Sequence, residues 1–217
     1  MSRRSAVSIL ISVLFLPQPI FAFNTPLSEE AVREAYFLGQ RHDGTFLRLL
    51  QQHVKLLPPP STGPHISSVA FLTPFIQLVQ FSDGYLGNYS AQQAWLDHKG
   101  RQETMEIVVE ILFTPTYGDM LPVPAGSKSD RTSLNYRQYD FWRDFQVQVT
   151  QGAEDLTPSN FDGQSKYSCS RRGCTRIGAT LRLTFPAEQF TSDPAIIRIT
   201  PPEGPEVIAE FDLARLR

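Results

Sequence analysis

The stretch TMEIVVEILF, residues Thr104 to Phe113, alternates apolar and polar side chains with a period of two residues over most of its length. Its odd-numbered positions are all apolar, whereas Glu106 and Glu110 stand at even-numbered positions. Successive side chains of a β-strand point to opposite faces of the sheet, so this pattern is typical of a strand that is buried on one face. The stretch therefore predicts a β-sheet that packs one face on a hydrophobic core.

Other segments also favour strands. Residues 145–151, 177–185 and 207–213 repeat the alternation, and residues 195–200 and a short segment before the first cysteine read as strands as well. The apolar stretches 67–72 and 74–81 also predict strands, and the second would be central because it is apolar on both faces. About eight strands with few helices between them favour antiparallel pairing. We therefore expect a mainly β fold with a minor helical part, an antiparallel β-sandwich over residues 65–217.

The segment before these strands favours helices. In TPLSEEAVREAYFLGQ, Ser28 is suited to cap a helix that runs to about Gly39. Apolar positions between Phe46 and Leu57 recur at helical spacing and stop at three consecutive prolines. We expect an N-terminal helical hairpin over residues 23–57 and a Pro-rich linker over residues 58–64.

One further helix is predicted inside the β region. Ser90 and Gln93 stand at capping-box spacing, and Gly100 supplies a C-terminal stop. In this helix Trp95 is expected on the buried side, near Ala91 and Leu96.

The first 22 residues have the features of a secretory signal peptide. Arg3 and Arg4 precede a mainly apolar run, and the small residue Ala22 is suited to cleavage. The run is shorter than the roughly 18 apolar residues of a membrane span, and no later stretch of the sequence approaches that length. We therefore expect no transmembrane span in the mature chain and a secreted or periplasmic location. Without residues 1–22 the chain has 18 basic against 22 acidic side chains, a net charge of −4 with histidine neutral. This balance disfavours nucleic acid as a partner.

Both cysteines lie in one short stretch, YSCSRRGC, residues Tyr167 to Cys174. In an exported chain Cys169 and Cys174 should be oxidised, and two cysteines alone do not complete a tetrahedral zinc site. A redox motif normally has two residues between its cysteines, not four. We expect a structural disulfide across a β-hairpin whose turn is eased by a left-handed Gly173.

This hairpin is rich in basic residues and has no acidic residue between Gln164 and Phe185. If Leu181 and Ile177 face the core, strand alternation turns Arg176, Arg182 and the opposed Tyr167 toward solvent and Lys166 inward. The candidate ligand-binding residues are Arg171, Arg172, Arg176, Arg182 and Tyr167. Guanidinium groups bind carboxylate, sulfate or phosphate, so an anionic glycan, lipid or protein surface is the expected partner. The other interpretation is that these charges only keep an edge hairpin soluble.

The segment from Thr114 to Arg137 has no regular period over its 24 residues. Unstructured loops of more than about 12–15 residues are uncommon in compact domains unless they are functional or disordered. Both interpretations stay open, a disordered loop with a mobile tip over residues 125–131 and a binding or lid segment.

No catalytic motif stands out in this sequence. It contains no nucleophile elbow, zinc-protease motif, phosphate loop or dinucleotide fingerprint, and its four histidines are not at metal-ligand spacing. His98 is best explained as a favourable charge at a helix C-terminus. We expect no metal, no cofactor and no catalytic residue, although two carboxylates that meet only in the fold are compatible with a glycoside hydrolase.

Four short runs resemble a family of uncharacterised secreted bacterial proteins. They are EAYFLGQR (residues 34–41), GPHI (63–66), FLTPF (71–75) and YSAQQA (89–94). The resemblance implies bacterial export and assigns no functional residue. The sequence as a whole favours a non-catalytic binding or envelope-associated module, and the alternative is a periplasmic hydrolase that acts on envelope polymers.

Overall fold

The computed structural model describes residues 25–41, 43–84, 89–121 and 135–216. Of these residues, 39% lie in strands and 28% in helices, so the fold is α+β and its helical share is larger than expected. The predicted signal peptide lies outside the described residues.

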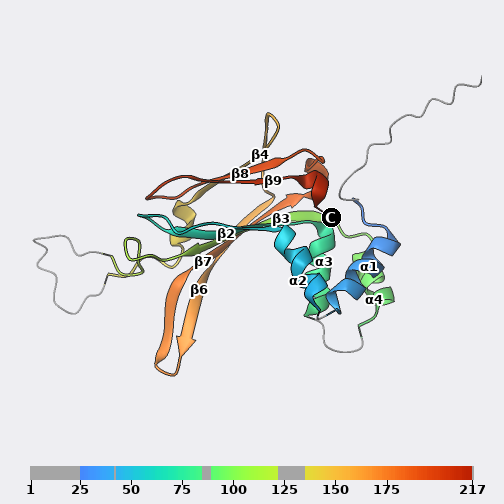
Figure 1. The fold of residues 1–217 in the computed structure, drawn as a ribbon, viewed down its shortest axis with the longest axis horizontal. Coiled ribbons are helices and arrows are strands. Elements are labelled where there is room, and N and C mark those ends of the chain that lie inside the picture. The colour runs from blue at the N-terminus through green and yellow to red at the C-terminus, as the bar shows by residue number, and fades with distance from the viewer. Residues whose placement is uncertain (1–24, 42, 85–88, 122–134, 217) are drawn as a thin grey trace, which may run out of the picture.

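Two antiparallel sheets form the β part (Figure 1). In the five-stranded sheet the strand order is β1 (Val54–Leu56), β2 (His65–Leu72), β3 (Thr104–Leu112), β7 (Gly173–Pro186) and β6 (Asn160–Ser170). In the four-stranded sheet it is β5 (Glu154–Leu156), β4 (Gln146–Gln151), β8 (Ala195–Thr200) and β9 (Val207–Phe211). Short 3-10 helices cover Phe141–Asp144, Ala187–Gln189 and Leu213–Arg215.

The main hydrophobic core draws side chains from both sheets. The alternation predicted for residues 104–113 is confirmed, since Met105, Ile107, Val109 and Ile111 are fully buried in β3. Leu181 of β7 lies in the same core, as do buried side chains of β4, β8 and β9. Burying an aliphatic side chain of this size contributes about 1.5–3 kcal/mol, so this shared core is what holds the two sheets together.

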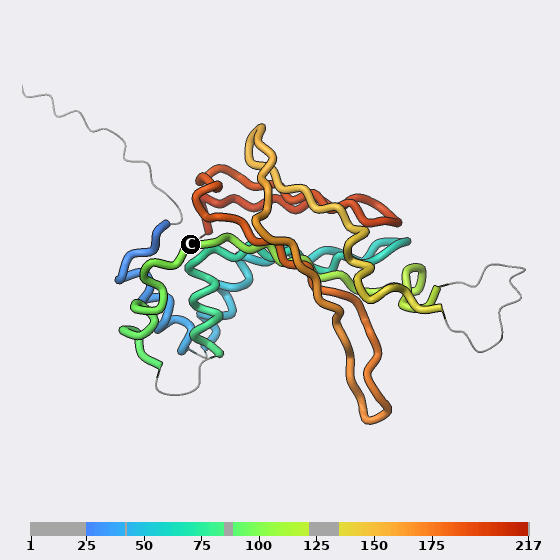
Figure 2. The backbone as a smooth tube through the Cα atoms, turned by 180° about the vertical axis from the view of Figure 1, so that it is seen from behind, coloured from blue at the N-terminus to red at the C-terminus, as the bar shows by residue number. Residues whose placement is uncertain are grey.

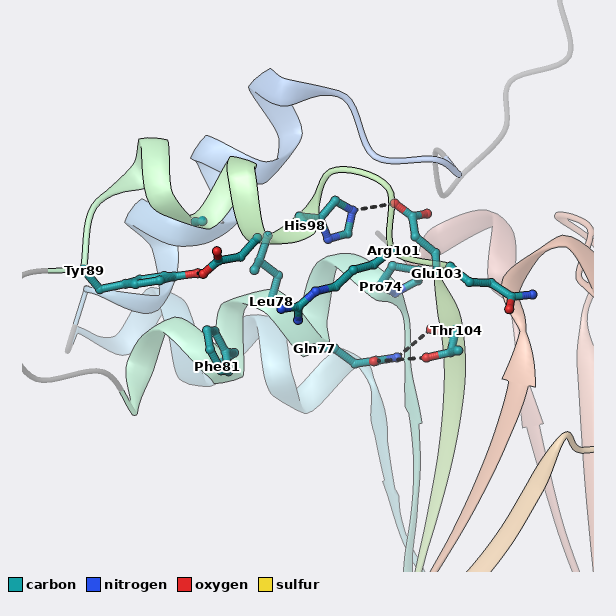
Figure 3. A pocket seen from close by; sticks show the side chains of 12 residues that line it. Pro74, Gln77, Leu78, Phe81, Tyr89, His98, Arg101, Glu103 and Thr104 are labelled. Atoms are coloured by element: carbon teal, nitrogen blue, oxygen red, sulfur yellow. Dashed lines mark hydrogen bonds and ion pairs between the residues drawn. The ribbon is translucent and has the colours of Figure 1, made fainter.

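Four helices gather at one end of the five-stranded sheet (Figure 1). They are α1 (Glu29–Gly39), α2 (Gly44–Gln52), α3 (Pro74–Asp83) and α4 (Ala91–His98). The helix α1 packs on α3 and α4 more than on its neighbour α2, so the expected hairpin is part of a larger helical layer. This layer has a core of its own, which includes Val32, Phe75 and Ile76. Gln77 of α3 links it to the sheet by donating to the carbonyl oxygen of Thr104 at 2.6 Å (Figure 3).

The strand predicted over residues 74–81 is wrong, because this segment is the helix α3. Thr73 caps it, with Oγ1 accepting a hydrogen bond from Ile76 N at 3.3 Å, and Pro74 occupies the first turn. A proline is well tolerated there because the first amide groups of a helix have no partner within the helix. The segment is apolar on several faces because it packs against α1 as well as the sheet, and a buried helix is not told from a central strand by periodicity alone.

The second predicted helix ends earlier than expected. It stops at Gln52, and Val54–Leu56 forms the edge strand β1 beside β2. Ser28 and Ser90 do cap their helices as predicted, with their side chains accepting from Ala31 N and Gln93 N. Trp95 is only partly buried, because Ala94 occupies the inner face of α4 instead.

Candidate functional site

The cysteine hairpin is a long two-stranded arm that extends away from the sheets and the helices (Figure 2). Pairing of β3 with β7 ends at Leu112 and Gly178, and the outer part of β7 pairs only with β6. Every residue from Tyr167 to Thr175 is exposed. Two-stranded hairpins are only marginally stable in water, so this arm needs a covalent or local constraint at its end.

The predicted disulfide supplies that constraint. Cys169 and Cys174 lie opposite each other in the ladder and are bonded, as expected. Arg171 and Arg172 form the turn, and Gly173 has a positive φ of 128°, as expected for a glycine at the turn of this hairpin. The side chains of both arginines have no ion pair or hydrogen bond among the described residues.

The register of the arm differs from strict alternation. Tyr167 does lie opposite Arg176, but Lys166 lies opposite Gly178, so Ile177 is an extra residue in β7. Such a β-bulge reverses the faces of the residues beyond it. Arg176 is therefore 9% exposed rather than facing solvent, and Lys166 joins the outer face of the sheet instead of pointing inward.

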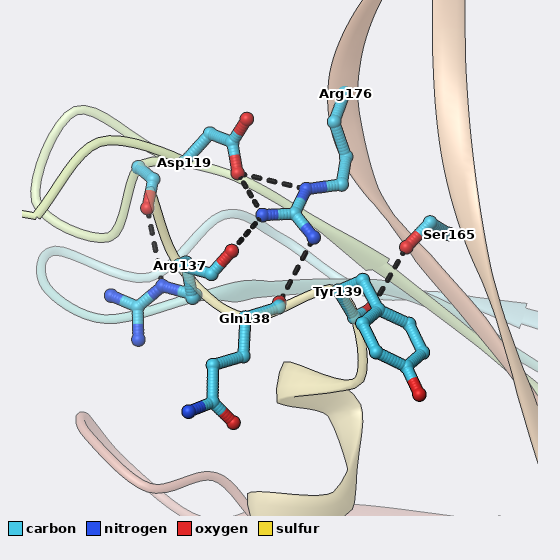
Figure 4. A network of polar contacts seen from close by, with 7 residues as sticks. Asp119, Arg137, Gln138, Tyr139, Ser165 and Arg176 are labelled. Atoms are coloured by element: carbon cyan, nitrogen blue, oxygen red, sulfur yellow. Dashed lines mark hydrogen bonds and ion pairs between the residues drawn. The ribbon is translucent and has the colours of Figure 1, made fainter. Parts of the chain in front are cut away.

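Arg176 anchors the base of the arm (Figure 4). Its Nε donates to Asp119 Oδ1 at 2.8 Å and its Nη1 to the carbonyl oxygen of Gln138 at 2.9 Å. Its Nη2 forms an ion pair with Asp119 and donates to the carbonyl oxygen of Arg137. Four of the five N–H groups of this guanidinium are thus engaged inside the fold, and its charge is paired with Asp119.

Two other cations of the hairpin are also neutralised locally. Lys166 forms an ion pair with Glu110, and Arg182 forms one with Glu106. Both acidic partners belong to β3, the strand next to β7. The positive surface predicted for the whole hairpin is therefore restricted to its tip, Arg171 and Arg172.

The predicted loop from Thr114 to Arg137 is ordered at both ends. Tyr117 is fully buried, and burial raises its pKa to about 12 although the nearby Arg137 opposes this shift. The guanidinium of Arg137 lies 3.6 Å from the centre of the Tyr117 ring. Met120 and Tyr136 pair through their backbones in an isolated antiparallel β-bridge. The predicted mobile tip, residues 125–131, lies outside the described residues.

A cavity of about 340 Å³ lies between α3, α4 and the start of β3 (Figure 3). His98, Arg101 and Glu103 line it together with apolar side chains of α3. His98 Nε2 lies 2.7 Å from Glu103 Oε1, which also accepts a hydrogen bond from Leu27 N at 2.6 Å. The Glu103 side chain is 6% exposed, and its Oε2 is buried without a partner among the described residues.

Sequence reasoning missed this pair of residues. It assigned His98 to the favourable charge at the C-terminus of a helix. The structure turns His98 toward Glu103 instead, because the chain folds back between α4 and β3. A separation of five residues across a helix end has no fixed geometry, so no sequence signal could have identified the contact.

The described residues contain no group of three or more histidine, cysteine or acidic side chains that could hold a metal ion. Among the same residues, no helix has the length and apolar character of a membrane span. The sequence matches no protein-family model, and no curated protein is significantly similar to it. The resemblance to exported bacterial proteins therefore stays a prediction.

Proposed function

We propose that this chain is an exported, non-catalytic binding module that uses the tip of the β6–β7 arm to bind an anionic partner. The observation that carries the proposal is that Arg171 and Arg172 are exposed and without an acidic partner among the described residues. They occupy the end of an exposed arm, the disulfide fixes the turn that holds them, and neither has an acidic partner in the described part of the chain.

The chemistry of the tip favours carboxylate, sulfate or phosphate groups as ligands. Each guanidinium can donate two parallel hydrogen bonds to such a group. Tyr167 is 55% exposed two residues before Cys169 and adds an aromatic surface to the arm. Arg176 and Arg182, also candidates from the sequence, support the arm through their ion pairs rather than contacting the partner.

The shape of the molecule supports the same role. The two sheets would serve as a β-sandwich scaffold, and the contacts of Arg176 with Asp119, Arg137 and Gln138 hold the base of the arm. A closed ring of six residues limits the conformations of the tip, which lowers the entropy lost when it binds. The disulfide stabilises the folded chain by only about 2 kcal/mol on the chain-entropy model, so we assign it to recognition rather than to global stability.

The test is binding of the oxidised mature protein to anionic glycans, to acidic proteins and to vesicles with anionic lipids, at low and moderate salt. Arg171→Ala/Arg172→Ala should weaken binding at least about tenfold, since hydrogen bonds to charged groups contribute about 1.5–3 kcal/mol each. The control is Arg48→Ala/Arg215→Ala, which removes the same charge from two exposed positions away from the arm. Equal losses in both double variants would mean that only net charge matters and would refute the proposal.

The double variant Cys169→Ser/Cys174→Ser removes the disulfide but keeps Arg171 and Arg172. It therefore separates the effect of the fixed turn conformation from the effect of the positive charge. We expect weaker binding by this variant, with unchanged salt dependence. A hydrolase acting on envelope polymers stays the alternative, and His98 paired with Glu103 is the observation that favours it. Among the described residues no hydroxyl or thiol is hydrogen-bonded to His98 as a nucleophile, so the binding role is better supported.

A further inference from the structure

The acidic groups of the α3–α4 cavity are already engaged by donors of this chain. Asp97 Oδ1 accepts a hydrogen bond from Gln93 at 2.8 Å, and its Oδ2 accepts one from the Tyr89 hydroxyl at 3.0 Å. Glu103 Oε1 is held by Leu27 and His98, while its Oε2 is closed off from solvent. The cavity therefore offers few free acceptors to a ligand.

The main donor of the cavity is not engaged. The Arg101 side chain extends across it, past Leu78 and Gln77 (Figure 3). In the described part of the chain its guanidinium has no ion pair and no hydrogen bond. Gln77, by contrast, donates to two backbone carbonyl oxygens, those of Leu72 and Thr104. Because the acceptors of the cavity are engaged and its charged donor is not, the cavity favours a ligand that brings a negatively charged acceptor to Arg101.

Most of the remaining wall of the cavity is apolar, apart from Gln102 and Thr104. Pro74, Leu78 and Phe81 come from α3, and Ala94 comes from α4. Small-molecule sites are mostly apolar with a few placed polar groups and typically measure about 300–1,000 Å³. At about 340 Å³ this cavity matches a small amphipathic molecule.

We propose that this cavity binds a small acid with an apolar body, whose carboxylate pairs with Arg101 and whose body packs on Leu78 and Phe81. His98 forms the inner wall, and its ring is held in place by Glu103. The site is independent of the basic arm, because it uses none of the same residues.

The experiment is titration calorimetry of the mature protein with octanoate, octan-1-ol and octylammonium, which share an apolar chain and differ in the head group. Octanoate should bind more tightly than the alcohol, and octylammonium most weakly. Arg101→Gln should weaken octanoate binding about tenfold and leave octan-1-ol unchanged. Arg48→Gln is the matched control and should bind octanoate like the wild type.

Three results would overturn the assignment. They are undetectable octanoate binding by the folded wild type, equal octanoate affinity in wild type and Arg101→Gln, and preference for octylammonium. Phe81→Ser should weaken the binding of every ligand that binds, because this half-exposed ring forms the apolar wall that contacts the shared apolar chain. Arg171→Ala/Arg172→Ala should bind octanoate normally, so failure of the arm proposal and failure of this one are distinguishable.

Discussion

Arg176 and Asp119 form an ion pair that joins the base of the β6–β7 arm to a segment 57 residues earlier. Their side chains are 8% and 20% exposed. The same guanidinium lies 5.5 Å from the centre of the Phe141 ring. The pair therefore fixes the arm, the loop after β3 and the segment before β4 at one point.

Removing this arginine should destabilise the whole fold. Arg176→Met keeps the length of the side chain but leaves Asp119 and the carbonyl oxygens of Arg137 and Gln138 without their donor. Breaking a largely buried pair in this way costs about 3 kcal/mol. Urea unfolding should show this loss in the free energy of unfolding, and Arg172→Met, at the exposed tip, should show none. Equal stability of the two variants would contradict the anchoring role.

Alternation within one strand predicted the core of this protein well. The inward set of β3 and the faces of Leu181, Leu183 and Phe185 follow from the pattern alone, because a period of two fixes the face of every side chain in a regular strand. The paired cysteines and the caps Ser28 and Ser90 were also predictable, because short-range chemistry determines them.

Features that depend on distant partners were not predictable. The bulge at Ile177 turns Arg176 inward and leaves Ile177 only partly buried, and no feature of the local sequence predicts it. The acidic partners Asp119, Glu106 and Glu110 lie outside the stretch whose charges were counted, so the basic patch looked larger than it is. Only the fold brings these groups together.

Leu181 and its neighbour Arg182 test the face assignment of β7. Leu181→Asp puts a carboxylate into the core between the sheets, where an unpaired charge costs several kcal/mol, and we expect loss of soluble folded protein. Arg182→Gln removes only a half-exposed ion pair with Glu106, so its effect should stay below about 1 kcal/mol. Circular dichroism and chemical unfolding measure the folding and stability of both variants. A tolerated Leu181→Asp together with a strongly destabilising Arg182→Gln would show that the two faces of β7 are exchanged.

Gly178 should be intolerant of any side chain. A Cβ at this position would overlap the carbonyl oxygen of Ile111 in the neighbouring strand, so the pairing of β3 and β7 would have to shift. We expect Gly178→Ala to lower the free energy of unfolding by about 3 kcal/mol. Gly44→Ala at the start of α2 is the control, because no atom beyond the adjoining residues and the backbone of its own helix lies within 4 Å of the added methyl group. A Gly178→Ala protein as stable as this control would argue against the close approach of Gly178 to Ile111.

The disulfide should protect the arm more than the fold. In Cys169→Ser/Cys174→Ser the free energy of unfolding should fall by no more than about 2 kcal/mol, while trypsin should cleave after Arg171 and Arg172 faster than in the oxidised protein. Mass spectrometry of the fragments locates the cuts. The oxidised protein should show no free thiol under denaturing, non-reducing conditions, and stoichiometric labelling of thiols would refute the assigned bond.

His53 should make the stability of the protein depend on pH. It is fully buried between α2 and β1, and its Nδ1 lies 2.9 Å from the carbonyl oxygen of Phe71. A carbonyl only accepts, so Nδ1 carries the proton, and the buried Nε2 has no partner among the described residues. Burial lowers the pKa of His53 below its ordinary value of 6.5, although the bond to Phe71 opposes this shift.

The direction of the effect follows from proton binding. Below pH 6.5 the unfolded chain takes up a proton at His53 that the folded chain does not, so acid favours unfolding. Stability from this residue is complete above pH 6.5 and declines as the pH falls from there toward the folded pKa, by about 1.4 kcal/mol for each unit of pKa difference. Urea unfolding at pH 7.5 and pH 5 should show a larger loss in the wild type than in His53→Gln, whose amide can still donate to Phe71. Equal losses in both proteins would show that His53 accepts a proton in the folded state.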